Sequence, residues 1–299
     1  VCSSDLSAFC NAGFDLHGSP EAPYVSLTGF QEDPLVILIT AVLIIFGGLG
    51  FVVWTDIIEL PRDRRLNFHS KVVLAMTGLL IAIGTIFFLV AESSNTANAL
   101  TIGSLPEWQR PLAAFFQSVA TRTAGFNSID QAAMTDGSKF FASILMFIGA
   151  APGSTGGGIK VTTFAVILAT IVSDFKGHEN IVIIRHRLQR ETFTRAFAIF
   201  GLALTLVMTT ALILSFIERA SIEAGRFQFI DLIFEAASAF GTVGLSAAGT
   251  ASLQPASWAL LIPVMFFGRV GPAAFAIILA MKNTEKRDLV HPDGKLMVG

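Results

Sequence analysis

Long apolar runs alternate with short charged stretches along the whole chain. Four of the runs have about the 20 residues that a membrane-spanning helix needs, and they lie at 35–54, 72–91, 196–217 and 258–281. A fifth run, at 140–172, is longer but is interrupted by glycines and a proline at 149–158. Two shorter runs, at 108–121 and 229–240, are about half a bilayer in length. This pattern predicts an all-α integral membrane protein in which spanning helices alternate with short helices that enter the membrane and turn back.

Three stretches of the chain share one pattern and end in a glycine turn. They read S-A-F-C-N-A-G-F at 7–14, V-A-T-R-T-A-G-F at 119–126 and S-A-F-G-T-V-G-L at 238–245. Glycine adopts a positive φ without a Cβ clash, so such turns can direct their carbonyls toward a common axis. Rings of carbonyls replace the hydration shell of an alkali cation in selectivity filters. A single copy would be explained better as a helix C-cap, but three copies in matching context favour a filter.

The filter hypothesis assigns four residues to each of these three Gly turns. They are Asn11, Ala12, Gly13 and Phe14 in the first turn, Thr123, Ala124, Gly125 and Phe126 in the second, and Thr242, Val243, Gly244 and Leu245 in the third. The short helix before each turn would point its C-terminus at the same centre, and the negative end of a helix dipole attracts a cation. This orientation indicates a cation pore, because an anion pore would present helix N-termini or basic side chains.

Composition also indicates a membrane protein. The chain of 299 residues is 53% hydrophobic and 14% charged, whereas soluble domains average about 25% charged residues. Its net charge of −2 gives no indication of nucleic-acid binding. Cys2 and Cys10 form neither a metal-binding spacing nor a disulfide framework. Because the chain starts at Val1 and its first Gly turn has no spanning helix before it, we expect an N-terminally truncated sequence.

Basic residues gather in three segments that should face the same side of the membrane. Thirteen of the 20 Lys and Arg lie at 61–71, at 174–195 and from 282 onward. Positively charged loops are retained in the cytoplasm, so these segments are predicted to be cytoplasmic. The three Gly turns would then all approach from the outside.

The interruption of the fifth apolar run reads G-A-A-P-G-S-T-G-G-G-I-K at 149–160. Inside a helix each glycine costs about 1 kcal/mol and the proline about 3 kcal/mol relative to alanine. We therefore expect two half-helices joined by a loop within the membrane, which is interpreted as a pliable plug below the filter or, alternatively, as a packing kink. A nucleotide-binding P-loop needs Lys directly after the last Gly and then a hydroxyl residue. Here Ile159 intervenes and Val161 follows, which argues against an ATP site.

Three cations, Arg122, Lys160 and Arg269, are expected at membrane depth. A charge near the bilayer centre costs about 2.5–3.5 kcal/mol on insertion scales, so each should face protein or water. Arg269 is interpreted as a fixed positive charge in the pore that contacts the 149–160 loop and limits leak, with a structural ion pair to Glu235 as the alternative. Arg122 directly precedes a Gly turn and should support the filter from behind, with Glu235 as a candidate partner. Lys160 is expected to form a pair or to extend toward the cytoplasm.

These motifs resemble those of the Trk/Ktr/HKT potassium transporters, and most nearly those of the Ktr potassium-translocating subunits. The resemblance rests on C-N-A-G-F, R-T-A-G-F, T-V-G-L, the glycine-rich run and F-F-G-R-V-G-P, and it covers the chain from about Ser7. It implies repeated M1–P-loop–M2 units (span, re-entrant pore helix, filter, span), four of which surround one pore in the family. Here it implies the back half of one unit at 1–56, a second unit at 57–175, and a third with a cytoplasmic tail at 176–299.

The resemblance also implies a gate and partners. The gate residues would be Gly149, Gly153, Ser154, Thr155, Gly156, Gly157, Gly158, Lys160 and Arg269. The protein would be a homodimer that passes several times through the lipid of a bacterial cytoplasmic membrane. A cytosolic nucleotide-binding regulatory ring of the KtrA/TrkA type would dock on its basic face.

The sequence therefore predicts K⁺ uptake, with K⁺ as the ion at the filter and with coupling to Na⁺ left open. One charge crossing 100 mV is worth about 2.3 kcal/mol, so uptake requires no ATP hydrolysis, no cofactor and no enzymatic activity in this chain. Alternatives within the class are an H⁺-coupled TrkH-type transporter and a less selective Na⁺/K⁺ pathway. A membrane ATPase is disfavoured by the failed P-loop pattern, and a purely structural subunit by the repeated filter.

Overall fold

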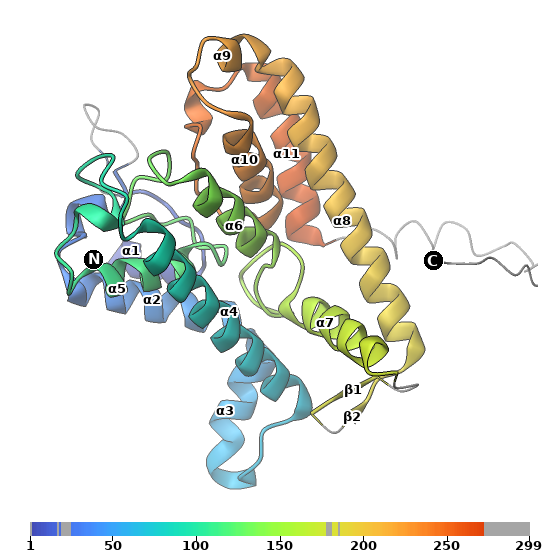
Figure 1. Cartoon of the computed structure of the whole chain (residues 1–299). Coiled ribbons are helices and arrows are strands. Elements are labelled where there is room, and N and C mark those ends of the chain that lie inside the picture. The colour runs from blue at the N-terminus through green and yellow to red at the C-terminus, as the bar shows by residue number, and fades with distance from the viewer. Residues whose placement is uncertain (1, 17, 19–24, 178–180, 185, 272–299) are drawn as a thin grey trace, which may run out of the picture.

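The structure, a computed structural model, describes residues 2–16, 18, 25–177, 181–184 and 186–271 (Figure 1). Its helices are α1 (Cys2–Phe9), α2 (Pro34–Leu49), α3 (Phe51–Asp63), α4 (Phe68–Glu92), α5 (Arg110–Ala120), α6 (Asp136–Phe147), α7 (Val161–Phe175), α8 (Arg190–Ile217), α9 (Arg219–Glu223), α10 (Phe229–Gly241) and α11 (Pro255–Val270). Single 3-10 turns lie at Thr28–Phe30, Ile102–Ser104 and Thr250–Ser252. Strands β1 (Val182–Ile183) and β2 (His186–Arg187) form one antiparallel hairpin. Apart from this hairpin and an isolated bridge between Ile148 and Ile159, the regular secondary structure of the described residues is helical, as the hydrophobic pattern predicts.

The helices pack as two groups (Figure 1). In one group α5 packs against α2 and α4, and α1 packs against α2; in the other, α8, α10 and α11 pack against one another. Helix α6 contacts both α4 and α10, while α7 contacts both α4 and α8, so these two helices join the groups. The Gly turns that follow α1, α5 and α10 therefore come from both groups.

Two of the predicted spans are confirmed as long apolar helices. In the described part of the chain, α4 and the 191–217 part of α8 are long and apolar enough to cross a membrane, and a third crossing is possible if α2 and α3 count together. The half-length helices predicted at 108–121 and 229–240 are present as α5 and α10. Short apolar helices of this kind cannot span a bilayer alone.

The prediction of one straight span at 35–54 is wrong. The chain breaks at Gly50, and α2 and α3 meet there at an angle of 99°. Gly50 has φ 86° and ψ 155°, a conformation that no residue with a side chain adopts readily. The expected boundary between the first and second units, at residues 56 and 57, consequently falls inside α3.

The predicted break in the fifth apolar run is confirmed. Helix α6 ends at Phe147 and α7 begins at Val161, and residues 148–160 between them form an irregular loop. We call this segment the 148–160 loop. The last predicted span is described only as far as Gly271, where α11 has ended at Val270; its expected remainder to residue 281 lies outside the described residues.

Two buried glutamates fix the ends of the long helices in the same way. Glu92, at the end of α4, accepts hydrogen bonds from the backbone N–H (3.0 Å) and hydroxyl (2.7 Å) of Thr135, the N-cap of α6. Glu218, at the end of α8, accepts from the backbone N–H of Gln254 (2.7 Å), the N-cap of α11, and from the Ser257 hydroxyl (2.6 Å). Burial alone would raise the pKa of Glu218, but these hydrogen bonds outweigh it and hold the pKa below its ordinary value.

A buried ion pair joins the N-terminal ends of α6 and α10. Lys139 Nζ lies 2.7 Å from Asp231 Oδ1, and both residues are buried. Asp231 also accepts the backbone N–H of Gln228 and so closes the first turn of α10. The pair holds a helix of one packing group against the helix that connects to the other group.

The two basic loops of the described chain meet at one end of the molecule. The α3–α4 connection and the β1–β2 hairpin lie together at the lower end of Figure 1. The ring of Phe68 in α4 packs on that of His186 in β2, with 4.5 Å between centroids. Two of the three basic segments therefore lie at the same end of the molecule, whereas the third, from residue 282 onward, lies outside the described residues; their cytoplasmic placement stays a prediction.

Candidate ion-selectivity site

The three Gly turns share one backbone conformation. The first and third residues of each turn have positive φ, whereas the residues between them do not. The φ values are 49° and 64° for Asn11 and Gly13, 64° and 80° for Thr123 and Gly125, and 49° and 94° for Thr242 and Gly244. Left-handed residues other than glycine are uncommon and mark functional or strained positions. Three copies of the same uncommon conformation indicate a shared structural role.

The glycines of the three turns converge. An ideal Cβ on Gly13 would lie 2.7 Å from the carbonyl oxygen of Ala124 and 2.8 Å from Cα of Gly125. A Cβ on Gly125 would lie 2.6 Å from the carbonyl oxygen of Val243 and 3.7 Å from Cα of Gly244. Only glycine allows the backbones to approach this closely. Turns far apart in the sequence thus meet at a single point, where they touch directly.

Each turn is tied to the short helix that precedes it. The backbone N–H groups of Ala12 and Val243 donate to the carbonyls of Ser7 and Ser238, at 2.9 Å in both cases. The hydroxyl of Ser7 accepts the N–H of Phe14 (2.9 Å), and that of Ser238 accepts the N–H of Gly244 (3.2 Å). The two serines occupy the same position in their motifs, and their carbonyls accept from equivalent residues, whereas the N–H groups that their hydroxyls accept lie one position apart in the alignment.

The 148–160 loop lies directly against the first residues of the turns. A Cβ on Gly156 would overlap the Thr123 hydroxyl, and one on Gly157 would overlap the Thr242 hydroxyl. The Thr155 hydroxyl donates to the carbonyl of Gly47 at 3.0 Å. The loop therefore lies against one side of the point where the turns meet.

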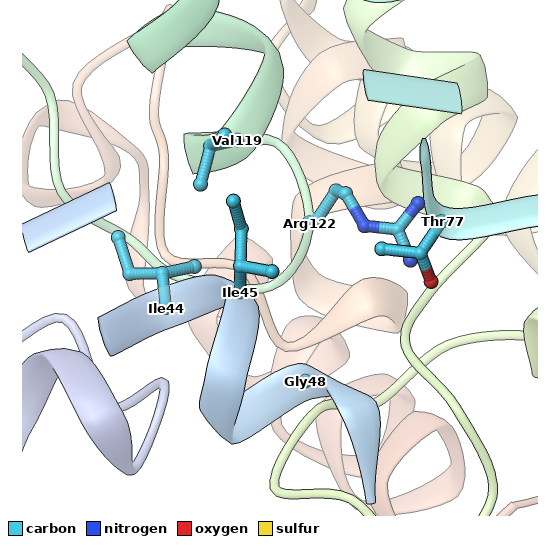
Figure 2. A pocket seen from close by; sticks show the side chains of 6 residues that line it. All are labelled: Ile44, Ile45, Gly48, Thr77, Val119 and Arg122. Carbon is cyan, nitrogen blue, oxygen red and sulfur yellow. The ribbon is translucent and has the colours of Figure 1, made fainter. Parts of the chain in front are cut away.

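Arg122 lies behind the second turn, as predicted, and reaches the loop. Its guanidinium is buried and donates to the Gly149 carbonyl at 3.4 Å. It lies beside Thr77, whose buried hydroxyl has no hydrogen-bond partner in the part of the chain that the structure describes, in a small cavity that Gly48 also lines (Figure 2). Among the described residues Arg122 has no carboxylate at ion-pair distance. The ends of α2, α5 and α6 lie near it, and the negative ends of helix dipoles offset a cation.

The alternative ion pair of Arg269 with Glu235 and the candidate pairing of Arg122 with Glu235 are both absent from the described residues. Glu235 is buried and accepts hydrogen bonds from the hydroxyls of Ser246 and Thr250, behind the third turn. Arg269 instead donates to the Thr242 hydroxyl at 3.5 Å. Uncharged hydroxyl groups therefore donate the hydrogen bonds that the Glu235 carboxylate accepts, although the sequence alone suggested this carboxylate as an ion-pair partner.

Lys160 and Arg269 lie on the loop side of the turns. Lys160 Nζ donates to the Gly156 carbonyl at 2.6 Å, and its charge is close enough to that of Arg269 for the two to repel each other. Ser154 bonds locally, to the Ala151 carbonyl (2.6 Å), whereas Arg269 donates to the Thr242 hydroxyl. Within the described ranges no group of three or more His, Cys, Asp or Glu could hold a metal ion.

Comparison with known proteins identifies the family. The family described as "TrkH: Cation transport protein" matches residues 2–288, nearly the whole chain. The chain belongs to the TrkH family. This confirms the resemblance carried by the Gly turns and the glycine-rich run.

Several curated TrkH-family relatives match the chain over nearly its full length. The Ktr system potassium uptake protein B of Bacillus subtilis is 36% identical over 294 residues, which are 98% of this chain and 62% of that protein. The protein of the same name from Vibrio alginolyticus is 38% identical over 298 residues, 98% of this chain and 61% of that protein. The potassium/sodium uptake protein NtpJ of Enterococcus hirae is 36% identical over 295 residues, 98% of this chain and 62% of that protein. The chain thus spans less than two thirds of the length of these relatives, each of which is named for ion uptake.

A solved TrkH structure has the same fold. The potassium transporter TrkH from Vibrio parahaemolyticus matches with a TM-score of 0.72 at 17% identity, over 91% of this chain and 56% of that one. At this identity the match establishes the architecture of the TrkH-family chain and not its substrate.

Sequence reasoning missed several groups that hold the TrkH-family site together. The anchoring role of Ser7 and Ser238 had a usable signal, because both stand first in the aligned motifs. Glu92 and Glu218 had a weaker one, since each ends a long apolar run. The docking of Thr155 on α2 had none, because its partner carbonyl lies 108 residues away.

Proposed function

We propose that this protein takes up K⁺ across a cytoplasmic membrane, along the axis on which the three Gly turns converge. The main observation that supports this proposal is that Gly13, Gly125 and Gly244 meet at one point, each in a left-handed conformation after a short helix. In such turns carbonyls can replace the hydration shell of K⁺. The family resemblance implies four turns around a pore, one more than the three in this chain, and we propose that the ion path opens within that ring.

The electrostatics of the site favour a cation. Helices α1, α5 and α10 end next to the turns, and each C-terminus carries the equivalent of about half a negative charge. Outside the third turn lies a hollow of about 750 Å³, lined in part by Asn127, Asp130 and Ser246. We assign this hollow as the outer mouth of the path, with Asp130 as its negative charge.

The unit order of M1, P-loop and M2 is also a proposal. The parallel roles of Glu92 and Glu218 support it, because each links the end of one long helix to the start of the helix that follows the short pore helix of its unit. The carbonyls of Ser7 and Ser238 support it in the same way, because they accept from the equivalent residues Ala12 and Val243. In this scheme the 148–160 loop is the gate, and Arg269 is a positive charge beside it.

The names of the relatives suggest the ion and the partners. Two are named for potassium uptake in a Ktr system, which supports K⁺ as cargo and a KtrA-type regulatory ring on the basic face. The relative from Enterococcus hirae is named for both potassium and sodium, which favours a less selective Na⁺/K⁺ pathway as the second candidate. We also propose Na⁺ coupling, a homodimeric state and a bacterial inner-membrane location on the family resemblance.

Ion uptake by cells that lack their own K⁺ transporters tests the proposal. Expression of the complete gene should restore growth at low K⁺, and uptake should stop when the membrane potential is dissipated, since about 2.3 kcal/mol per 100 mV drives each charge. Equal uptake of Na⁺ and K⁺ would support the second candidate. Protein that inserts normally but transports neither ion would contradict both.

The proposed orientation makes a separate prediction. A cysteine in place of exposed Ala97, on the outer α4–α5 connection, should react with an impermeant reagent in intact cells. One in place of exposed His186, on the basic hairpin, should react only after permeabilisation, because basic loops are retained inside. Labelling of position 186 in intact cells would reverse the orientation and the direction of the Gly turns.

A further inference from the structure

The 148–160 loop is docked on the break between α2 and α3. The N–H of Ala151 donates to the Gly48 carbonyl at 3.1 Å, and the Thr155 hydroxyl and N–H donate to the Gly47 carbonyl at 3.0 and 3.4 Å. In the opposite direction, the N–H of Phe51 donates to the carbonyl of Gly153 at 3.2 Å. Backbone groups exposed by the break therefore hold the loop.

The same backbone groups could satisfy each other. Gly47 and Phe51 are four residues apart, so in a continuous α-helix the N–H of Phe51 would donate to the carbonyl of Gly47. Here each of these two groups bonds to the loop instead. Docking of the loop and continuity of the helix thus compete for one donor and one acceptor.

The conformation of Gly50, which has no side chain, allows the bent arrangement with the docked loop to form in place of the continuous helix. Its φ of 86° produces the 99° bend that opens this helical turn toward the loop. A Cβ at this position would lie 2.5 Å from the carbonyl oxygen of Pro152. The loop can rest against the break only because residue 50 has no side chain.

We infer that Gly50 is the positioning residue of the gate, and that the α2–α3 break and the 148–160 loop exchange hydrogen bonds as one two-state unit. The inference rests on the proposed function of the loop as gate. In the docked state α2–α3 is bent and the loop lies against Thr123 and Thr242. In the released state the helix closes through Gly50, and the loop moves away from Thr123 and Thr242, so that the ion path opens.

In both states the exchange gives the backbone groups of the break and of the loop hydrogen-bond partners inside the membrane. Backbone polar groups at that depth need a partner in protein or in a water-filled cavity. On release, the Phe51 N–H and the Gly47 carbonyl pair within the helix, while the polar groups of the loop meet pore water. Bistable elements of this kind convert small differences in contact into discrete states.

The bend angle can be measured independently of transport. Spin labels at Leu38 in α2 and Ile58 in α3, both exposed, would be about 30 Å apart along a continuous helix and about 20 Å apart across the bend. The labelled protein carries serine in place of Cys2 and Cys10. Gly50→Ala should raise the long-distance population about tenfold, because alanine favours the helix and disfavours positive φ. K⁺ flux should rise with it.

Matched variants separate this effect from misfolding. Gly78→Ala lies within α4 with no heavy atom within 4 Å of the added Cβ, so distances and flux should stay as in the wild type. Thr155→Val removes the hydroxyl bond to Gly47 without altering α2 or α3, and should also lengthen the distance, whereas Thr155→Ser should restore it. These two variants keep the test valid if Gly50→Ala fails to insert.

The outcomes distinguish the inference from the proposed function. A wild-type protein that transports no K⁺ contradicts the proposed function, while the distances still report on the exchange. If K⁺ uptake is normal and both Gly50→Ala and Thr155→Val leave the short distance unchanged, the inference is wrong. A longer distance without higher flux would also overturn it, because the bend would then not control the gate.

Discussion

Replacing Gly125 by Ser in the complete protein should raise the apparent KM for K⁺ about tenfold or more and let Na⁺ compete better. The residue has φ 80°, and its Cβ would lie 2.6 Å from the Val243 carbonyl oxygen and 3.0 Å from Cα of Gly13. A left-handed conformation costs a residue with a side chain about 1–2 kcal/mol, and about 1.4 kcal/mol is tenfold in affinity. Relief of the strain moves the carbonyls that would bind the ion.

The measurement is K⁺ uptake against increasing Na⁺, normalised to inserted protein. Gly78→Ser is the matched control, since the added side chain in α4 meets no neighbour within 4 Å. It should leave both KM and Na⁺ competition unchanged. Unaltered K⁺ affinity and selectivity in a normally inserted Gly125→Ser variant would remove the filter assignment.

Removal of residues 156–158, or Arg269→Ala, should raise K⁺ flux severalfold and weaken its dependence on the regulatory ring. The shortened loop would no longer reach Thr123 and Thr242, against which Gly156 and Gly157 now pack. Arg269→Ala removes a positive charge beside Thr242 that opposes a cation leaving the filter.

The packing-kink alternative predicts the opposite result, lower expression together with lower flux. Uptake per correctly inserted protein separates the two interpretations. Arg219→Ala serves as a charge-loss control, because Arg219 lies on exposed α9 and pairs only with its neighbour Glu223 in the described structure. If both gate variants lose flux in proportion to protein while the control does not, the gate assignment is wrong.

Hydrophobicity and glycine placement were enough to predict most of the architecture. The runs at 72–91 and 196–217 became α4 and α8 because a long apolar stretch has few alternatives in a membrane. The break at 149–160 could be predicted because several glycines and a proline together are costly in a helix. The conformation of the Gly turns followed from a threefold repeat, which a single copy would not have revealed.

The features that the sequence did not predict depend on changes in chain direction and on contacts between residues far apart in the chain. Gly50 sits in an apolar run whose hydropathy is that of a straight span, because composition records burial and not a change in direction. Arg269 lies one residue before the end of α11 and donates to the Thr242 hydroxyl, a partner 27 residues away that the hydropathy of its own run does not indicate. The carboxylate of Glu235, the candidate ion-pair partner, accepts hydrogen bonds from the hydroxyls of Ser246 and Thr250. Both residues follow α10 closely in the chain, and a search for opposite charges does not identify hydroxyl partners.

The Lys139–Asp231 ion pair constrains the order in which the protein can be assembled during synthesis. Its partners are 92 residues apart, and the whole of α8 is made between them. Helices α6 and α10 have 12 and 13 residues, too few to cross a bilayer of about 20 helical residues on their own. Until Asp231 has left the ribosome, burying Lys139 would leave a charge without a partner, at a cost of several kcal/mol. We therefore expect the N-terminal end of α6 to stay at the water interface until α8 has been inserted. Only then can α6 and α10 dock against each other.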